Sequence, residues 1–148
     1  MQEGIQDTLD DLRDLARGIY PPLLADKGLA AALEAQSRKA ALPITIDAGG
    51  IARYPREVEA AVYFCALEAL QNVAKYARAT SAEIRLQDGE GRLAFTVTDD
   101  GVGFDVHGAA GSGLTNMRDR LDALGGSLRV RSSPGAGTTI SGSIPLAP

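Results

Sequence analysis

The sequence predicts a two-layer α/β sandwich in which helices cover one face of a mixed, largely antiparallel sheet. Three observations support this prediction. Helical and strand-like segments alternate along the 148 residues, and two pairs of strand-like segments are joined by short glycine-containing turns. One helical segment is also longer than the others and has a broad apolar face. Hairpins supply antiparallel strands, and the long helix supplies a surface that packs against them.

The composition limits the class of protein. A chain of 148 residues that is 45% hydrophobic can form one compact domain. Its net charge of -4, with scattered Lys and Arg residues, argues against a nucleic-acid partner. The single cysteine, Cys65, lies in an apolar stretch and is expected to be buried. Apolar stretches interrupted by charges predict a cytoplasmic domain, so any membrane attachment of the full-length protein would use segments absent here.

The N-terminal region has apolar residues at helical spacing. They are Ile5, Leu9, Leu12, Leu15 and Ile19. This stripe predicts an amphipathic helix that ends at Pro21-Pro22, so we expect residues 1–22 to be separate from a main domain at 23–148. A second helix is predicted from about 28 to 41, followed by a short strand over 43–47.

The central helix is predicted over residues 56–77, the longest helical pattern in the chain. After it, residues 82–87 and 92–98 alternate in polarity on either side of a turn at 88–91, which predicts a β-hairpin. The second of these strands runs into Asp99-Asp100-Gly101.

The C-terminal third begins with a glycine-rich segment. Residues 102–113 hold four glycines and precede a predicted helix over 114–124, which Gly125-Gly126 can end. Residues 127–132 and 138–144 then predict a closing hairpin.

A polar stripe on the long helix is the first candidate site. Glu68, Asn72 and Lys75 are spaced i, i+4 and i+7, so they fall on one side of the helix. A carboxylate, an amide oxygen and an ammonium group suit a magnesium-bound polyphosphate. The alternative is an ordinary solvated helix face.

Two further clusters contain glycine. Asp99 lies at a strand end, where its carboxylate can accept a hydrogen bond from an exocyclic amine, and Gly101 and Gly103 let a planar base approach the backbone. A calcium-binding turn is the alternative, but residues 101–104 supply no side-chain oxygen. Gly111-Ser112-Gly113-Leu114 precedes a helix, where backbone amides can face an anion, although it matches neither a P-loop nor a dinucleotide motif.

Together these motifs resemble the Bergerat ATPase fold shared by gyrase, heat-shock chaperone, mismatch-repair and histidine-kinase families. ALEALQNVAKYA resembles its N box, DDGVGF its first glycine box and GSGL its second, in the same order. Gly137-Thr138-Thr139 resembles the strand motif whose threonine helps to hold adenine. The resemblance covers about residues 56–146.

The flanking sequence resembles sensor histidine kinases of the nitrate-sensor and lipid-fluidity-sensor subgroup. LDDLRDLARGIYPPLLADKGLAAALEA is similar to their second dimerisation helix and the junction after it, so residues 1–22 would be a remnant of that helix. Two features depart from the pattern: Tyr76 stands where this subgroup usually has histidine, and the phosphoacceptor helix is missing. His107, the only histidine, is interpreted as lid surface and not as the acceptor.

The resemblance implies roles for the candidate residues. Asp99 would bind the adenine amino group, and Thr138 would support the purine. Asn72 would help to ligate Mg2+ and Lys75 would contact phosphate. Glu68 would orient a water or assist proton removal, unless an acidic residue beside the missing histidine is the base.

The resemblance also implies roles for the glycines, two at the base site and two in a lid over the phosphates. Gly101 and Gly103 would open the base site. Gly111 and Gly113 would let the backbone of a lid over about residues 101–113 close on the phosphates, and Leu114, directly after the lid, would also contribute to nucleotide binding.

The implied activity is transfer of the ATP γ-phosphate to a histidine on a dimerisation domain absent from this chain. The full-length kinase would be a homodimer that serves a response regulator. Two alternatives stay open. An anti-sigma-factor type serine kinase uses a similar domain without dimerisation helices, which the stripe over 5–19 disfavours. A non-catalytic nucleotide-binding module is disfavoured by intact Glu68, Asn72 and Asp99.

Overall fold

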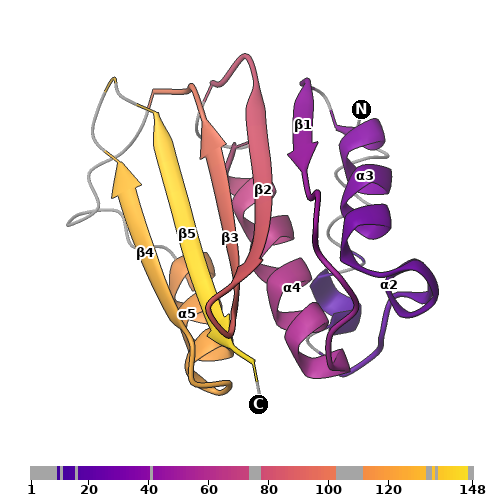
Figure 1. Cartoon of the computed structure of the whole chain (residues 1–148). Coiled ribbons are helices and arrows are strands. Elements are labelled where there is room, and N and C mark those ends of the chain that lie inside the picture. Colours follow the sequence, from indigo (N-terminus) through magenta and orange to yellow (C-terminus); the bar gives the residue numbers. More distant parts are fainter. Residues whose placement is uncertain are drawn as a thin grey trace.

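The fold consists of one sheet with helices on one of its faces (Figure 1). The computed structural model describes residues 10, 12–15, 17–40, 42–73, 78–102, 112–132, 135 and 137–146. The helices are α2 (Pro22–Lys27), α3 (Leu29–Lys39), α4 (Arg56–Asn72) and α5 (Ser112–Asp122). The strands are β1 (Ile44–Asp47), β2 (Ala82–Gly89), β3 (Arg92–Asp99), β4 (Ser127–Ser132) and β5 (Thr138–Pro145). This arrangement confirms the predicted two-layer α/β sandwich.

The sheet is mixed, as predicted. Its strand order is β1-β2-β3-β5-β4. Among the described residues, β1 and β2 pair in parallel, whereas the other three pairs are antiparallel. The last strand in sequence, β5, therefore lies between β3 and β4 inside the sheet (Figure 1).

The β2–β3 hairpin has the predicted glycine-containing turn. Glu90 and Gly91 both have positive φ values, 56° and 74°, as a two-residue type I′ turn requires. The side chains of β3 alternate between the core and the opposite face of the sheet, with Leu93, Phe95 and Val97 buried. The hairpin thus brings the two strands together over their whole length.

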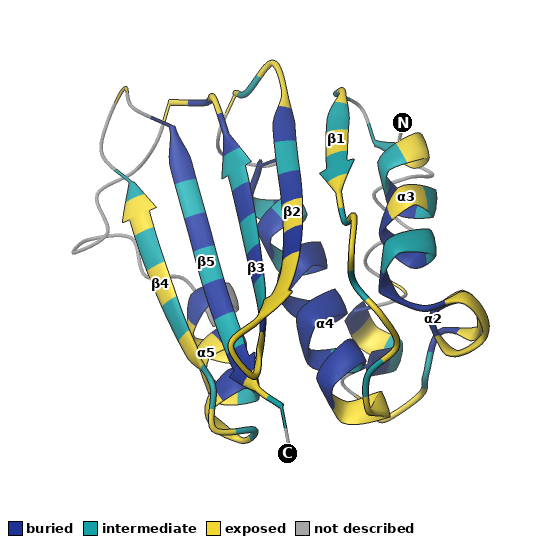
Figure 2. Cartoon of the chain, viewed as in Figure 1, coloured by how far each residue is buried: buried dark blue, intermediate teal, exposed yellow. Residues whose placement is uncertain are grey.

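Helix α4 is the centre of the core, and most of its residues are buried (Figure 2). On one side, Gln36 of α3 donates a hydrogen bond to the Tyr63 hydroxyl at 3.1 Å. On another, the Cys65 thiol lies 3.9 Å from the Met117 carbonyl of α5. Burial raises the pKa of Cys65 to about 12, so this thiol is an inert core residue, as predicted. Among the described residues, no helix is both long and apolar enough to cross a membrane.

The N-terminal helix ends earlier than predicted. Gly18 has φ 78° and donates to the Leu15 carbonyl at 3.0 Å, while Ile19 donates to the Asp14 carbonyl at 2.7 Å. These two bonds form a Schellman motif, which ends a helix before a left-handed glycine. The proline pair does not end this helix. Pro22 instead begins the short helix α2, which the sequence did not predict, at a position where proline is favoured.

The predicted apolar stripe is confirmed only in part. Leu12 and Leu15 are buried in the core. Ile19 follows the Schellman turn and is 50% exposed, so it leaves the stripe. Ile5 and Leu9 lie outside the described residues.

Gly142 in β5 is a position where any side chain would overpack the core. A Cβ atom there would lie 2.4 and 2.5 Å from two ring atoms of Phe95. We expect Gly142→Ala to lower the free energy of unfolding by about 2 kcal/mol, measured by urea denaturation. Gly89→Ala is the matched control, since a Cβ there meets nothing within 4 Å. Equal effects of the two substitutions would contradict the overpacking.

Candidate nucleotide-binding site

Three of the predicted site elements meet at one end of the fold. Strand β3 ends at Asp99, β5 begins at Thr138, and Asp99 and Thr138 are direct partners in the antiparallel register. Helix α4 ends at Asn72. Thr80 and Ser81, further along the chain, donate hydrogen bonds from their amides to Asp100, the residue directly after β3. In Figure 1 the C-terminal ends of α4 and β3 and the start of β5 all lie at the upper end of the molecule.

Asp99 is a largely buried carboxylate, only 8% exposed. Its Oδ1 accepts a hydrogen bond from the Gly101 amide at 2.8 Å. Burial raises the pKa of Asp99 and the charge of Asp100 adds to the rise, whereas the Gly101 bond opposes both. Within the described residues, Oδ2 has no hydrogen bond, so this oxygen is available as an acceptor for a donor group of a ligand.

Thr138 is also 8% exposed, and its hydroxyl lies 2.8 Å from the Ser132 hydroxyl. The Ser132 hydroxyl can also donate to the Gly137 carbonyl at 3.1 Å. Either hydroxyl can donate in the Ser132–Thr138 pair, and the Thr138 oxygen has a lone pair that can accept a hydrogen bond from a ligand or a water. Thr138 thus adds a second acceptor beside Asp99.

Gly137 allows β5 to begin directly against the end of β3. Its φ is 74°, and a Cβ atom there would lie 2.4 Å from the Asp99 carbonyl oxygen. The sequence indicated Gly137 only as part of the motif that contains Thr138. The structure adds a physical reason for this glycine, because neither its conformation nor its surroundings accept a side chain.

Asp100 has a positioning role that sequence reasoning missed. Its carboxylate accepts hydrogen bonds from the amides of Thr80 and Ser81, at 2.8 and 3.1 Å, and from both of their hydroxyls. The Thr80 hydroxyl bond is the largest cause that lowers the pKa of Asp100, to about 2. Asp100 therefore fixes the segment after α4 to the end of β3. No local pattern reveals this contact, because the partners are 19 and 20 residues away.

We expect Asp100→Asn to lower the Tm at neutral pH, because an amide satisfies fewer of these donors. A carboxylate whose pKa is lower in the folded protein than in the unfolded chain stabilises the fold fully at pH values above the unfolded pKa, near 3.8. This stabilisation is lost as the pH falls toward the folded pKa of about 2. The Tm difference between the parent protein and the variant should therefore shrink over that range. Thermal unfolding followed by circular dichroism measures it, and a difference that does not change with pH would contradict the assignment.

Two of the three residues of the predicted polar stripe lie on α4. Glu68 and Asn72 are half-buried and lie one turn apart on this helix. Helix α5 begins at Ser112, so Gly113 and Leu114 lie in its first turn, and the Leu114 side chain is buried in the core. The remaining predicted site residues, Lys75, Gly103 and Gly111, lie outside the described residues, as do Tyr76 and His107.

Magnesium is compatible with this donor set only as an ion shared with a ligand. Among the described residues, no group of three or more His, Cys, Asp or Glu side chains is placed to hold a metal. Asn72 offers one amide oxygen at the end of α4. Mg2+ commonly takes one or two protein oxygens and completes its shell with phosphates and waters. The residues therefore fit a magnesium ion that arrives with a polyphosphate.

The comparison with protein families agrees with this geometry. Residues 57–148 match the family described as histidine kinase-, DNA gyrase B-, and HSP90-like ATPase. The chain is 35% identical to the sensor histidine kinase MctS of Rhizobium johnstonii, over 97% of this chain and 33% of that protein. It is 32% identical to the oxygen sensor histidine kinase NreB of Staphylococcus carnosus, over 97% of this chain and 44% of that protein.

Solved structures show the same relationship. The histidine kinase domain of the blue-light activated histidine kinase from Erythrobacter litoralis aligns with a TM-score of 0.64 and 26% identity, over 79% of this chain and 57% of that one. The chain spans a third to less than half of the two curated relatives. These relatives are histidine kinases, so the anti-sigma alternative is not favoured. The chain belongs to the histidine kinase-, DNA gyrase B-, and HSP90-like ATPase family.

Proposed function

We propose that this domain binds ATP with Mg2+ at the shared end of α4, β3 and β5, and transfers the γ-phosphate to a histidine on a separate dimerisation domain. The observation that best supports the proposal is the pairing of buried Asp99 with Thr138 in register, beside the end of the helix that carries Asn72. In this proposal, Asp99 and Thr138 would be acceptors for the base and Asn72 would be an oxygen ligand for the metal.

Recognition of adenine would rest on Asp99. With Oδ1 held by the Gly101 amide, Oδ2 can accept a hydrogen bond from the exocyclic amine of the base. Guanine presents a carbonyl oxygen at the equivalent position, which would face the carboxylate without a hydrogen between them. The Thr138 oxygen would accept from a water or from the base edge. The domain should therefore prefer ATP to GTP.

The phosphates would lie toward α4 and the start of α5. Asn72 would contribute an oxygen to Mg2+, and Lys75 would contact a phosphate. Backbone amides at the start of α5, with Gly111 and Gly113, would face the phosphates at the positive end of the helix. Magnesium, when bound, neutralises phosphate charge and fixes the phosphate oxygens.

The transfer itself would depend mainly on positioning. An imidazole nitrogen of the acceptor histidine attacks the γ-phosphorus, the bond to the β,γ-bridging oxygen breaks, and ADP leaves. A base takes the proton from the imidazole. Glu68 is one candidate base or water-positioning residue, and an acidic residue beside the acceptor histidine is the other. The chain would hold ATP in line with a nucleophile that it does not itself supply.

The test uses radiolabelled ATP and a separately supplied dimerisation domain that contains the acceptor histidine. Transfer should give a phosphate that is stable in base and labile in acid, as expected of phosphohistidine. A phosphate that is stable in acid, on a serine of an antagonist protein, would overturn the proposal. The domain alone should not phosphorylate itself, because the nucleophile lies elsewhere.

We expect this domain to act in the cytoplasm. The kinase would be a homodimer, and a response regulator would receive the phosphate from the histidine.

A further inference from the structure

Gln71, the residue before Asn72 at the end of α4, carries an unpaired hydrogen-bond acceptor. The residue is only 6% exposed. Among the residues that the structure describes, its Oε1 is the one buried side-chain oxygen or nitrogen without a hydrogen-bond partner. A buried acceptor that is removed from water without gaining a donor is unfavourable. An oxygen of this kind is therefore a candidate contact for a ligand.

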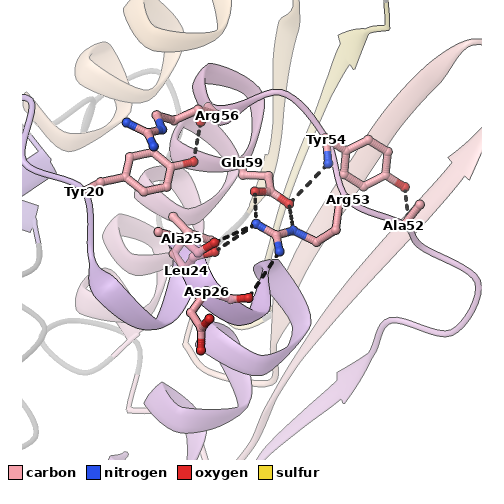
Figure 3. Close-up of polar contacts among 9 residues, drawn as sticks. All are labelled: Tyr20, Leu24, Ala25, Asp26, Ala52, Arg53, Tyr54, Arg56 and Glu59. Carbon is pink, nitrogen blue, oxygen red and sulfur yellow. Dashed lines mark hydrogen bonds and ion pairs between the residues drawn. The ribbon is translucent and has the colours of Figure 1, made fainter.

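Glu59, near the start of the same helix, shows how the fold satisfies another buried polar group. Its side chain is 2% exposed, and its two oxygens accept from Nε and Nη2 of Arg53 at 3.0 and 3.3 Å. The Tyr54 amide adds a hydrogen bond at 3.3 Å (Figure 3). Arg53 also donates to the Ala25 carbonyl of α2, at 3.0 Å. Both oxygens of this carboxylate thus have donors within the chain.

Gln36 of α3 is the best comparison, because it is a glutamine buried to a similar extent. It is 5% exposed, and its Nε2 donates to the Tyr63 hydroxyl at 3.1 Å. Asp99 and Thr138 have the partners described above. Gln71 is therefore the exception among the buried polar residues of the described chain. An apolar side chain of similar length would fill the same space without this cost, so the amide points to a ligand.

The position of Gln71 on α4 places it within the polar stripe of the candidate site. It lies three residues after Glu68 and directly before Asn72. Residues three or four positions apart share one side of a helix, so Glu68 lies one turn before both of them. Glu68 and Asn72 are half-buried, whereas Oε1 of Gln71 lies beneath the surface. The unpaired oxygen thus belongs to the residue adjacent to the proposed metal ligand.

The chemistry of a nucleotide limits the donors that suit this oxygen. Phosphate oxygens accept hydrogen bonds, and the exocyclic amine of adenine belongs to Asp99 in the proposed function. The ribose hydroxyls can donate, but they lie on the sugar, away from the β- and γ-phosphates. The waters that complete a Mg2+ shell are donors, and a water is small enough to reach an atom that the protein surface covers.

We propose that Gln71 is a positioning residue of the nucleotide site, and that its Oε1 accepts a hydrogen bond from a water of the Mg2+ shell that Asn72 helps to hold. This inference rests on the proposed function. The hydrogen bond orients the water, as groups outside the ligand shell do at other metal sites. Gln71 therefore contributes to the affinity for nucleotide with Mg2+ and not to the affinity for nucleotide alone.

Calorimetry with a non-hydrolysable ATP analogue tests this metal dependence. Each protein is titrated with excess Mg2+ and again with EDTA, and the ratio of the two Kd values gives the advantage that Mg2+ confers. Gln71→Met removes the acceptor and keeps a side chain of similar length. It should weaken binding about tenfold in Mg2+ and leave binding in EDTA unchanged. An undiminished Mg2+ advantage in this variant, or an equal loss in both conditions, would overturn the proposal.

Gln71→Glu separates an acceptor from a donor. Its carboxylate keeps an acceptor at the same reach but has no hydrogen to donate when it is ionised. This variant should keep a Mg2+ advantage at least as large as that of the parent protein. Weaker binding in EDTA would mean that the amide nitrogen donates to a phosphate, which would overturn the assignment. Gln87→Met, at an exposed glutamine on β2, is the surface control and should change neither Kd.

Thermal unfolding without nucleotide gives an independent measurement. Because Gln71→Met removes an acceptor that has no partner, it should raise the Tm by about 3 °C. Gln36→Met is the matched control, since it breaks the hydrogen bond to Tyr63. It should lower the Tm and leave the Mg2+ advantage unchanged. An unchanged or lower Tm of the Gln71→Met variant would show that its amide is already satisfied in the nucleotide-free fold, which would contradict the proposal.

Failure of the proposed function would give a different pattern. If the parent protein binds no nucleotide in either condition, both the function and the role of Gln71 are overturned. If the parent protein binds with a Mg2+ advantage and the Gln71→Met variant keeps that advantage, only the role of Gln71 is overturned.

Discussion

Replacing Asn72 with alanine is expected to lower phosphotransfer about 100-fold or more, because the reacting phosphates lose a fixed oxygen ligand for their metal ion. Asn72 is half-buried at the last position of α4, so its truncation should leave the core intact. Initial rates of label transfer from ATP to the acceptor domain measure the loss. Circular dichroism establishes that the variant is folded.

Asn72→Asp is the informative companion to the alanine variant. It keeps an oxygen ligand but adds a negative charge near the phosphates, so its rate should fall between those of the parent and Asn72→Ala. Full transfer by the alanine variant would remove Asn72 from the site, even if the domain still binds ATP.

The second large effect is expected at Asp99. Asp99→Asn should weaken ADP binding about 100-fold, because a charged acceptor is replaced by an amide that has a donor of its own. ADP allows binding to be measured by calorimetry without phosphotransfer. Asp122→Asn, exposed at the end of α5, is the control and should bind as the parent does. Equal affinities of the Asp99→Asn variant and the parent would show that this carboxylate does not hold the base.

Asp99 also predicts a dependence of nucleotide affinity on pH. Burial raises the pKa of this carboxyl, and protonation removes a charged acceptor. As the pH falls through this raised pKa, ADP affinity should decline at a higher pH than it would with an ordinary aspartate. The pH dependence of ADP affinity in the Asp99→Asn variant shows how much of the effect comes from protonation of adenine itself.

Most of the fold could be predicted because its signals are local. The long apolar face predicted α4, and the turn with Gly91 predicted the β2–β3 hairpin. The closing hairpin predicted over residues 127–132 and 138–144 likewise corresponds to β4 and β5. The candidate site followed from residues at the ends of these elements, and strand register then placed Asp99 opposite Thr138.

What could not be predicted depends on contacts between distant residues. Arg53 meets α2 across 27 to 29 residues, and Arg120 meets Leu15 across 105. No periodicity reports such pairs. The start of α2 was missed for a different reason, since a proline pair indicates the end of a helix as readily as its beginning.

The position of β5 in the sheet has a consequence for how the domain is made. A ribosome delivers β4 and α5 before β5, yet β4 has β5 as its partner in the sheet. While β5 is still being translated, β4 has no strand to pair with and β3 has one open edge. Closure of the sheet must therefore wait for the last strand, and nascent chains that stall before Thr138 should be prone to aggregation and proteolysis.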